Sequence, residues 1–485
     1  MAKDLLYMKK QNTFYITTPI FYPNAELHMG NVYPVILCDI LARYHRLIGD
    51  TTYFLTGSDE HSTKVVKMAE KAGKTTEDFL KVTVGGFKTL FASLDISHDQ
   101  FIRTSDREIH WPGAILMWNK LVEAGDIYKK SYKGLYCIGC EAFVTEKDLV
   151  GGKCQYHDTV PELLEEENYF FRLSKYTEKV KEKIVSGELN VMPDSRKAEI
   201  LALLDRGLED VSFSRPASKN PWAIPVPNDP TQTMYVWCDA LVNYISAIGY
   251  GRDDKMFEIY WPVDFHVIGK DILRFHTAFW PAMLMSAGLP LPKNILVHGM
   301  ILSGGRKMSK TLGNVIDPQV HIAEYGKDAF RYFIARHLST FEDSEITPES
   351  YKDAYNANLA NGIGNLVSRV MKMVVSYDIS YEIVMGENKL IKEYSAHLDR
   401  FEINKAIDIV FAKVGELDAF IQTSQPFKTI KTDSKKAHAD IAYLAQELYV
   451  VGEALAPFMP ETSATIMSLV ASKKSPEKPL FERRM

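Results

Sequence analysis

Two lysines flank a methionine and a serine in the sequence KMSKT, which follows the glycine pair of SGGR. The side chains of Lys307 and Lys310 could neutralise the charge of a polyphosphate, and the glycines would let the loop close over it. With Met308 and Ser309, they form a candidate phosphate-binding loop. On its own, the match favours an ordinary solvated basic loop.

A second candidate lies near the N-terminus, in the sequence HMGN. His28 and Gly30 stand where a strand pattern gives way to a helix pattern. Backbone N–H groups at a helix N-terminus attract phosphate, and glycine permits close approach. His28 could also donate a hydrogen bond to an oxyanion that develops in a transition state. The alternative is that His28 only begins the helix.

Three cysteines and a histidine follow a metal-binding spacing, with two close pairs separated by thirteen residues. These residues are Cys137, Cys140, Cys154 and His157. Three thiolates and one imidazole suit tetrahedral zinc, and four protein ligands predict a closed, structural site. A redox pair of Cys137 and Cys140 is the alternative, but it leaves Cys154 and His157 unexplained.

The elements that must position the two loops alternate between β and α. Residues 12–20 predict a strand and residues 32–49 a helix that ends at Gly49. Residues 50–61 predict a second strand ending in a polar cluster, and residues 64–73 a second helix. This alternation favours an α/β fold, a doubly wound, Rossmann-like parallel sheet that binds ligands at the carboxyl ends of its strands.

The rest of the chain divides by pattern. We expect the first half of the catalytic domain in residues 1–110, a connective insertion with the zinc knuckle in 111–230, and the second half of the sheet in 231–347. Long amphipathic stretches predict an all-α helical bundle in 348–485. The final KKSPEKPLFERR reads as a tail.

Composition excludes several classes of protein. The chain has 485 residues, of which 46% are hydrophobic and 25% charged, so it is globular rather than disordered. Its net charge of −5 gives no general attraction to nucleic acid. We find no signal peptide, transit segment or membrane span, and expect a cytoplasmic protein. Cys38 and Cys238 lie in apolar surroundings, which is typical of buried thiols.

Taken together, HMGN and KMSKT resemble the two motifs shared by the class I aminoacyl-tRNA synthetases. Further stretches resemble the methionyl-tRNA synthetases in order and spacing, from about Thr13 to Pro460: TTPIFYPNAELHMGN, GSDEH, VWCDALVNY, HVIGKDILRFHTAFWPAML and KMSKTLGNVIDP. The resemblance implies a ligase that uses ATP to activate L-methionine as methionyl-adenylate and transfers it to the terminal adenosine of tRNA(Met), with Mg²⁺ accompanying the nucleotide.

The resemblance also implies roles for individual residues. Those implied in catalysis are His28, Asn31, Lys307 and Lys310. The family's first motif usually ends in histidine; the amide of Asn31 can donate a hydrogen bond but cannot carry a proton. Contacts to ATP are implied for His28, Gly30, Asn31, Gly269, Asp271, Lys307, Met308, Ser309 and Lys310. For Asp271, which would face the ribose, the alternative is a helix N-cap.

The methionine pocket implied by the resemblance consists of Ile20, Tyr22, Asp59, Trp237, Tyr244, Ile272 and His276. Asp59 would hold the substrate ammonium. Trp237, Tyr244 and Ile272 would wall a pocket for the polarisable thioether. Without the family, a tryptophan and a tyrosine seven residues apart would more often be core. Leu241 stands where some relatives have proline, so the pocket wall could differ.

In the helical domain, Asn358, Asn361, Asn365 and Arg369 are spaced to share one helix face. A polar solvated stripe is the alternative, but the resemblance implies that Asn365 and Arg369 read the anticodon. Phe427 stands where the family commonly offers a tryptophan for base stacking, and its ring is smaller and lacks an N–H.

These features also argue against some related enzymes and against other classes of protein. The insertion leaves little room for a hydrolytic editing domain, which disfavours the isoleucyl, valyl and leucyl enzymes. Two rivals are a nucleotidyltransferase that makes an adenylate without tRNA and a catalytically silent tRNA-binding paralogue. The helical domain speaks against the first, and retention of both loops and the pocket against the second. The chain ends soon after the bundle, so we expect no appended dimerising domain and a monomer.

Overall fold

The computed structural model describes residues 12–138, 142–146, 149–155, 158–308 and 314–484. The chain forms two compact units, each built from separated stretches. The first unit comprises Met1–Glu26, Asp50–Thr89 and His98–His298, and the second comprises Leu27–Gly49, Leu90–Ser97 and Gly299–Met485. Each unit is described by itself.

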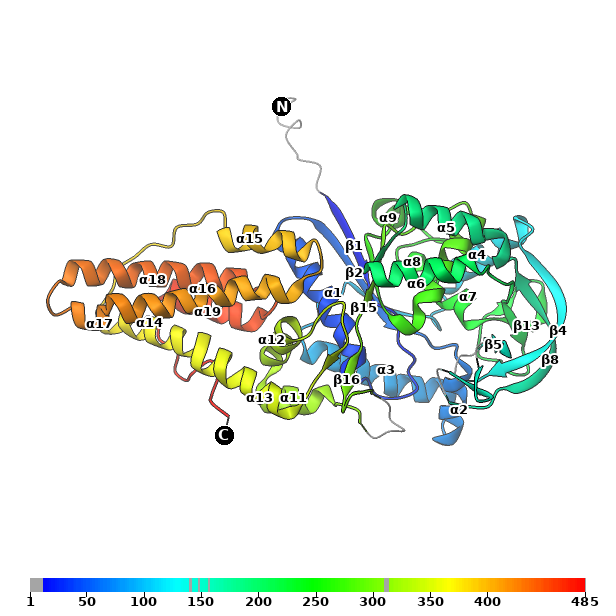
Figure 1. Cartoon of the computed structure of the whole chain (residues 1–485), viewed down its shortest axis with the longest axis horizontal. Coiled ribbons are helices and arrows are strands. Elements are labelled where there is room, and N and C mark those ends of the chain that lie inside the picture. The colour runs from blue at the N-terminus through cyan, green and yellow to red at the C-terminus, as the bar shows by residue number, and fades with distance from the viewer. Residues whose placement is uncertain (1–11, 139–141, 147–148, 156–157, 309–313, 485) are drawn as a thin grey trace, which may run out of the picture. The chain divides into compact units, whose positions relative to one another are not determined.

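The first unit is organised by a six-stranded sheet (Figure 1). Its strands, in spatial order, are β3 (Gln100–Arg103), β2 (Thr51–Ser58), β1 (Thr13–Thr17), β14 (Phe265–Gly269), β15 (Asn294–His298) and β9 (Asn190–Met192). Every neighbouring pair is parallel. The chain runs from β1 outward through β2 and β3 on one side, while β14 and β15 occupy the other. The strand order therefore reverses at β1, where such folds bind ligands, and the predicted doubly wound sheet is confirmed.

Short helices connect the strands of the first unit. They are α2 (Thr63–Lys71), α4 (Trp111–Glu123), α5 (Thr177–Ser186), α6 (Asp194–Asp205), α7 (Val236–Ala240), α8 (Asn243–Ser246), α9 (Lys255–Tyr260) and α10 (Trp280–Ser286). Helix α3 (Thr76–Ser93) belongs partly to each unit. Two single-turn elements precede α10: a 3₁₀ turn at Lys270–Ile272 and a π-helix at Phe275–Phe279. Bulges of this π type inside helices are frequently found at functional sites.

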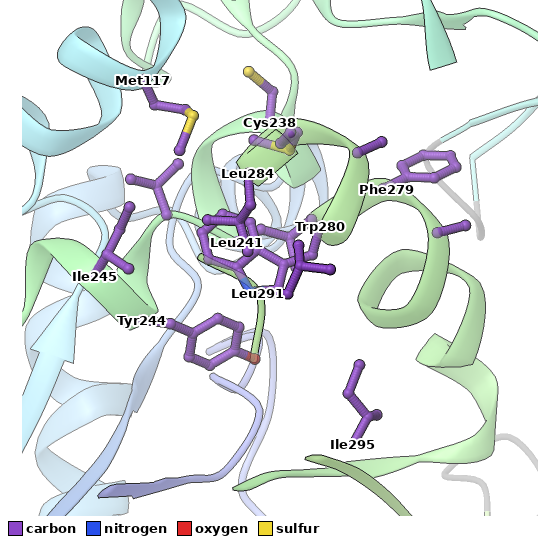
Figure 2. Close-up of a cluster of buried hydrophobic side chains, with 14 of the residues drawn as sticks. Met117, Cys238, Leu241, Tyr244, Ile245, Phe279, Trp280, Leu284, Leu291 and Ile295 are labelled. Carbon is purple, nitrogen blue, oxygen red and sulfur yellow. The ribbon is translucent and has the colours of Figure 1, made fainter. Parts of the chain in front are cut away.

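The largest core of the first unit lies beside the sheet. Leu241 and Tyr244 from the α7–α8 segment point toward Trp280 and Leu284 from α10 (Figure 2). Met117 from α4 is part of the same cluster. Trp280 and Met117 are fully buried. This packing fixes α7 and α8 against the helix that follows β14, so the residues on these helices have little freedom to move.

The range predicted as an insertion contains its own antiparallel sheet. The long strands β4 (Ile127–Cys137) and β8 (Glu162–Phe171) pair along most of their length, flanked by β5 (Ala142–Val144) and β10 (Val211–Ser212). A small hairpin joins β6 (Leu149–Val150) to β7 (Lys153–Cys154), and three further strands form a separate sheet: β11 (Ser214–Pro216), β12 (Pro225–Val226) and β13 (Asp229–Met234). One strand of this range, β9, instead extends the main sheet by pairing with β15.

The second unit is mainly helical. Its long helices are α1 (Met29–Leu47), α12 (Lys327–His337), α14 (Asn365–Ser376), α15 (Lys389–Leu398), α16 (Ile403–Ser424), α18 (Ser434–Ala454) and α19 (Pro460–Ser472). Helices α14, α16 and α18 run side by side as a bundle (Figure 1), which confirms the predicted helical C-terminal region. Shorter elements are α11 (Pro318–Tyr325), α13 (Pro348–Ala354), α17 (Pro426–Thr429) and a small sheet of β16 (Ile301–Ser303), β17 (Arg306–Lys307) and β18 (Ser344–Glu345).

A buried ion pair joins the early and late parts of the second unit. Asp39 on α1 and Arg331 on α12 are both fully buried, and Arg331 Nη2 lies 2.7 Å from Asp39 Oδ2. The guanidinium also donates from Nε to the carbonyl oxygen of Phe458 at 2.9 Å. Burial raises the pKa of Asp39, but Arg331, Arg43 and Ser97 outweigh it and hold the pKa below the usual value. The carboxylate therefore stays ionised. A charge that is buried away from water is stable only when it is paired with an opposite charge.

The prediction of a C-terminal tail is wrong. Phe481 is buried and packs edge-on against Tyr355, with ring centroids 6.0 Å apart. The Tyr355 hydroxyl donates to the Glu482 carbonyl at 3.0 Å, and the backbone of Arg484 exchanges two hydrogen bonds with the side chain of Asn356. A single aromatic residue among charges gives no periodic signal, so the sequence pattern alone did not reveal this packing.

Two predictions about the whole chain can be compared with the structure. Cys38 and Cys238 are buried, as predicted, and burial raises the pKa of both thiols well above the usual value. Among the helices in the described ranges, none combines the length and the apolar character needed to cross a membrane.

Candidate active site

The loop after β1 and the end of β2 form one side of the predicted amino-acid pocket. Phe21 donates its N–H to the Gly57 carbonyl at 3.0 Å, and the N–H of Asp59 donates back to the Phe21 carbonyl at 2.9 Å. These bonds align the loop that carries Ile20 and Tyr22 with the segment that carries Asp59. Asp59 is only 3% exposed, so its carboxyl group is buried just after the carboxyl end of β2. When ionised, such a group can hold a cationic group by charge-assisted hydrogen bonds.

Tyr244 and His276 form the polar centre of the opposite side. The Tyr244 hydroxyl lies 2.7 Å from His276 Nε2, and His276 Nδ1 lies 3.0 Å from the Ile272 carbonyl oxygen. Because the carbonyl only accepts, Nδ1 carries the proton, and Nε2 then accepts from the tyrosine when the ring is neutral. Burial lowers the pKa of His276 to about 4, so the ring is neutral at physiological pH.

Trp237 completes an aromatic wall. Its ring stacks on Phe275, with centroids 3.9 Å apart and planes inclined by 7°. It also meets the ring of His276 edge-on at 6.3 Å. Ile20, Tyr22, Trp237 and Ile272 are half-buried and pack against the core cluster that contains Tyr244. The predicted methionine-pocket residues are thus all in the first unit, and six of them are brought together in or against this cluster and its aromatic contacts.

Phe275 was missed by the sequence analysis. It lies one residue before His276 in the π-helix, where backbone hydrogen bonds join residues five apart instead of the four of an α-helix. This widened turn lets Phe275 contact Trp237 while His276 contacts Tyr244. No pattern in FHTAFW distinguishes a π-turn from an α-helix, so residue spacing gave no warning.

The predicted nucleotide residues Gly269 and Asp271 lie at the end of β14. A side chain at position 269 would place its Cβ 2.8 Å from Asp271 Oδ1. The Asp271 carboxylate thus lies close to the backbone of Gly269, and a side chain at position 269 would displace it. Asp271 is exposed and lies inside the 3₁₀ turn Lys270–Ile272, whose N-cap position is Gly269, so Asp271 is not the N-cap residue of that turn.

His28 and Asn31 begin helix α1 in the second unit. His28 Nδ1 accepts from the Gly30 N–H at 3.1 Å, and Asn31 Oδ1 accepts from the His28 N–H at 3.1 Å. The two residues thus cap the helix reciprocally, and the alternative interpretation of His28 as a helix-start residue is confirmed. Because Nδ1 accepts, the proton of neutral His28 lies on Nε2, where it can be donated to an anionic oxygen.

The two predicted phosphate-binding motifs meet within the second unit. A Cβ at Gly30 would lie 3.3 Å from the terminal methyl of Met308, so Met308 packs closely against the backbone of Gly30. Met308 follows the hairpin of β16 and β17, whose turn residues Gly304 and Gly305 have φ angles of 65° and 70°. Positive φ at both positions is what a tight two-residue turn requires. The glycines are therefore turn residues; Ser309 and Lys310 lie outside the described residues, as does the side chain of Lys307.

Two of the four predicted zinc ligands can be placed. Cys137 ends β4 and Cys154 ends β7, and both are 1% exposed within one small cluster with Val144. Thr159 contacts both: its hydroxyl lies 3.8 Å from Cys137 Sγ, and its carbonyl accepts from the Cys154 N–H. Cys140 and His157 lie outside the described residues. Within the described ranges, no group of three or more metal-ligating side chains is present.

The predicted RNA-reading face is interrupted. Asn358 and Asn361 lie in a π-helix, Tyr355–Gly364, in which Gly362 departs from helical geometry with φ −89° and ψ −106°. Asn365 and Arg369 begin a new helix, α14, so the four side chains do not follow one regular helical stripe. Asn365 is exposed, and Arg369 is paired with Asp418. Phe427 on α17 is 38% exposed.

Two family models match the chain in succession. The model described as "tRNA synthetases class I (M)" matches residues 14–156 and 144–371. The model described as "Anticodon binding domain of methionyl tRNA ligase" matches residues 380–479. Together they account for both the parallel-sheet unit and the helical bundle.

Individual relatives agree with these models. The chain is 39% identical to the methionine--tRNA ligase of Thermotoga maritima, over 97% of this chain and 77% of that protein. It is 40% identical to the enzyme of Caldanaerobacter subterraneus subsp. tengcongensis, over 94% of this chain and 73% of that protein. The solved Mycobacterium tuberculosis methionyl-tRNA synthetase in complex with methionyl-adenylate superposes with a TM-score of 0.90 at 34% identity, covering 98% of this chain and 100% of that one. The chain therefore belongs to the methionine--tRNA ligases, a family of class I aminoacyl-tRNA synthetases.

Proposed function

We propose that the protein activates L-methionine with ATP, releasing pyrophosphate, and transfers the methionyl group to the terminal adenosine of tRNA(Met). The observation that carries the proposal is the group of side chains that the first unit brings together. A buried carboxylate, an aromatic wall and a tyrosine–histidine hydrogen bond lie at the carboxyl ends of β1, β2 and β14. Sites at this edge of a doubly wound sheet bind ligands.

Asp59 and the aromatic wall would select methionine by its two ends. The Asp59 carboxylate accepts hydrogen bonds from the substrate ammonium, which stabilises both charges away from water. The stacked ring of Trp237 and the half-buried side chain of Ile272 contact the thioether, whose sulfur is polarisable and makes favourable contacts with aromatic rings. The hydroxyl proton of Tyr244 is already directed at His276, so this wall is largely apolar toward the substrate.

The first reaction step needs no nucleophile from the protein. The carboxylate oxygen of methionine attacks the α-phosphorus of ATP, and the bond to the bridging oxygen of pyrophosphate breaks. Charge accumulates on the phosphate oxygens, where His28 donates a hydrogen bond from Nε2 and Asn31 from its amide. Lys307 and Lys310 neutralise the departing pyrophosphate, while Met308 and Ser309 belong to the same loop. Mg²⁺, when bound with ATP, supplies further positive charge.

The end of β14 would hold the nucleotide. The Asp271 carboxylate lies beside Gly269, where it can accept hydrogen bonds from ribose hydroxyls. Glycine at 30 lets the phosphates approach the N-terminus of α1, whose unsatisfied N–H groups favour anions. The enzyme therefore contributes positioning and charge neutralisation rather than covalent chemistry.

A structural zinc ion is proposed in the knuckle of residues 137–157. Cys137 and Cys154 fit the role because their thiols are buried in the same small cluster, although the two residues end different strands, β4 and β7. Cys140 and His157 would complete a tetrahedral set. Such an ion would stabilise a segment that has few apolar residues of its own.

The helical bundle would recognise the anticodon of tRNA(Met). Asn365 presents an exposed amide that can read the edges of unstacked bases, and Arg369, held by Asp418, has a defined orientation. Phe427 exposes part of its ring for stacking on a base. We propose that the enzyme acts in the cytoplasm, where translation occurs, and that it is a monomer. Its catalytic domain would comprise residues 1–110 and 231–347, its insertion 111–230 and its anticodon-binding domain 348–485.

Methionine-dependent exchange of labelled pyrophosphate into ATP tests the proposal. We expect exchange with methionine and not with the other nineteen amino acids, in the absence of tRNA. The variant Lys310→Ala should lower the exchange rate far more than the affinity for methionine, because the lysine acts mainly in the transition state. If folded protein gives no exchange with any amino acid, the chain is a silent tRNA-binding paralogue.

A further inference from the structure

A buried carboxylate lies beside the pocket and has no part in the chemistry described above. Asp239, on α7, is fully buried between two imidazoles. His61 Nδ1 lies 2.5 Å from Asp239 Oδ2, and His110 Nε2 lies 2.5 Å from Asp239 Oδ1. Both histidines are at most 1% exposed. Each carboxylate oxygen is therefore bound by a different histidine from a distant part of the chain.

The positions of the protons in this cluster follow from which groups can donate hydrogen bonds and which can only accept them. Burial raises the pKa of Asp239, but His61 and His110 outweigh that effect and hold it at about 2. An ionised carboxylate only accepts hydrogen bonds, so His61 donates from Nδ1 and His110 donates from Nε2. His110 is further fixed by a 2.8 Å hydrogen bond between Nδ1 and the Ser246 hydroxyl. The other ring nitrogen of His61, Nε2, is buried and has no hydrogen-bond partner among the described residues.

The cluster joins the two sides of the amino-acid pocket. His61 lies two residues after Asp59, and Asp239 lies two residues after Trp237. The backbone of the His61 segment has a second anchor, because the His61 carbonyl accepts from Asn220 Nδ2 at 2.7 Å. The imidazole itself has Asp239 as its one hydrogen-bond partner among the described residues. The His61–Asp239 bond is thus a direct link between the segment bearing the charge and the helix bearing the aromatic wall.

We propose that Asp239 and His61 are positioning residues, which set the separation of the Asp59 carboxylate and the Trp237 ring so that both ends of methionine are bound at once. His110 holds the second oxygen of Asp239 and so fixes the carboxylate's rotation. This inference rests on the proposed roles of Asp59 and Trp237. It predicts an effect on methionine binding beyond any effect on folding, because a misplaced pocket loses affinity even when the fold survives.

A purely structural role is the competing explanation, and Asp126 provides a matched control. Its carboxylate is also fully buried in the first unit, where it accepts from the Tyr176 hydroxyl at 2.5 Å and the Ser286 hydroxyl at 2.7 Å. Lys175 also donates to it at 2.7 Å, and none of these three partners among the described residues is proposed to bind methionine. Asp126→Asn should lower the melting temperature while leaving the affinity for methionine within about twofold of wild type, a change below 0.5 kcal/mol.

Asp239→Asn is the first test variant. Its amide can accept from one histidine, but its NH₂ group then faces the N–H of the other, so one imidazole must turn or change its tautomer. We expect the Kd for methionine, measured by calorimetry on the full chain, to rise about tenfold or more, which corresponds to one buried hydrogen bond left unmade. The KM for ATP should change much less than the KM for methionine.

Crossed substitutions of the two histidines distinguish positioning from mere packing. An asparagine amide nitrogen reaches about as far from the backbone as Nδ1 of histidine, whereas a glutamine amide nitrogen reaches about as far as Nε2. Since His61 uses Nδ1 and His110 uses Nε2, His61→Asn and His110→Gln should retain methionine affinity. His61→Gln and His110→Asn should lose it. Packing alone predicts no such reversal between the two positions.

The outcomes separate this inference from the proposed function. Wild-type protein that fails to exchange pyrophosphate with methionine would overturn both. Normal wild-type exchange, with all Asp239 and His61 variants lowering the melting temperature but leaving the methionine Kd unchanged, would overturn only the positioning role. If Asp239→Asn does not fold, the two His61 variants decide, because equal methionine affinities for His61→Asn and His61→Gln would contradict the proposal.

Discussion

The indole of Trp237 lies flat against the ring of Phe275, with centroids 3.9 Å apart. The contact joins α7 to the π-helix after β14, two segments that reach the pocket from different parts of the chain. Contacts between aromatic rings contribute about 0.5–1.5 kcal/mol beyond the area that they bury. The pocket wall is consequently a pair of rings that depend on each other for their orientation.

Replacing Trp237 should therefore weaken methionine binding. We expect Trp237→Ala to raise the Kd for methionine by about tenfold or more, and Trp237→Phe to have a smaller effect because a ring still stacks on Phe275. Calorimetric titration with methionine measures both. Trp118→Phe is the control for Trp237→Phe, since Trp118 is a buried tryptophan of the first unit whose ring contacts Tyr169. A Trp118 variant with the same loss of affinity would argue against a specific role for Trp237.

Asp59→Asn should weaken binding of the substrate ammonium. A hydrogen bond to a charged group contributes about 1.5–3 kcal/mol, so the Kd for methionine should rise by about 10–100-fold. A methionine analogue without the amino group makes the test specific. That analogue should bind wild type poorly and lose little further affinity in the variant, because the two changes remove the same interaction. Additive losses would place the ammonium elsewhere.

Stability should fall as the pH is lowered through the range in which buried histidines resist protonation. Burial lowers the pKa of His276 to about 4 from the usual 6.5, and lowers that of His266 well below 6.5. Between these values the unfolded chain binds protons that the folded chain does not, so the free energy of unfolding decreases as pH falls from 6.5 to 4. At about 1.4 kcal/mol per pKa unit, His276 accounts for roughly 3 kcal/mol of that decrease.

Urea denaturation at several pH values measures this effect. His276→Asn removes the titrating group, so its free energy of unfolding should depend less steeply on pH between 6.5 and 4 than that of wild type. The variant will be less stable at neutral pH because Tyr244 loses its partner. The slope is therefore the decisive quantity, and parallel curves for the two proteins would exclude His276 as a contributor.

Arg331→Met should destabilise the second unit strongly. The substitution leaves the fully buried Asp39 with one cationic partner, Arg43, and removes the donor to the Phe458 carbonyl. Breaking a buried pair in this way costs about 3–5 kcal/mol. Arg43→Met removes the other partner of the same carboxylate, but Arg43 is 22% exposed, so its loss should cost less. Thermal unfolding that ranks the two variants in the opposite order would contradict this account.

Metal analysis should find about one zinc ion per chain in protein purified without chelator. Cys154→Ser should lower the zinc content and make the segment around β4 and β8 more susceptible to proteolysis, because the metal would replace an apolar core there. Cys238→Ser is the control, since that thiol is buried in the main core of the first unit. Zinc-free wild-type protein with an intact fold would contradict the proposal of a structural zinc ion.

The regular parts of the fold were predictable from the sequence. The first strand, α1 and the second strand follow short-range apolar periodicity, and they lie at Thr13–Thr17, Met29–Leu47 and Thr51–Ser58. Features that depend on long-range packing were not predictable from such patterns. The burial of Phe481 and the kink at Gly362 are examples, since neither has a periodic signal.

The residues of the candidate site also include some that were predictable from the sequence and some that were not. The residues of the methionine pocket were expected from motif resemblance, and the meeting of Gly30 with Met308 agrees with the idea that the two loops act together. The Asp239 cluster could not be foreseen, because its partners are 178 and 129 residues away and each is an unremarkable single histidine. Hydrogen bonds over such separations are decided by tertiary packing rather than by local sequence.

The pairing of Asp39 with Arg331 has a consequence for synthesis of the protein. The carboxylate leaves the ribosome roughly 290 residues before the guanidinium, which at about 5–20 residues per second is an interval of roughly 15–60 s. Throughout that time α1 has an apolar face and an acidic side chain that can pair with Arg43 on the same helix, but whose second cationic partner, Arg331, does not yet exist. Helix α1 must remain solvated, or be shielded by a chaperone, until α12 has been made, and only then can the second unit close around both.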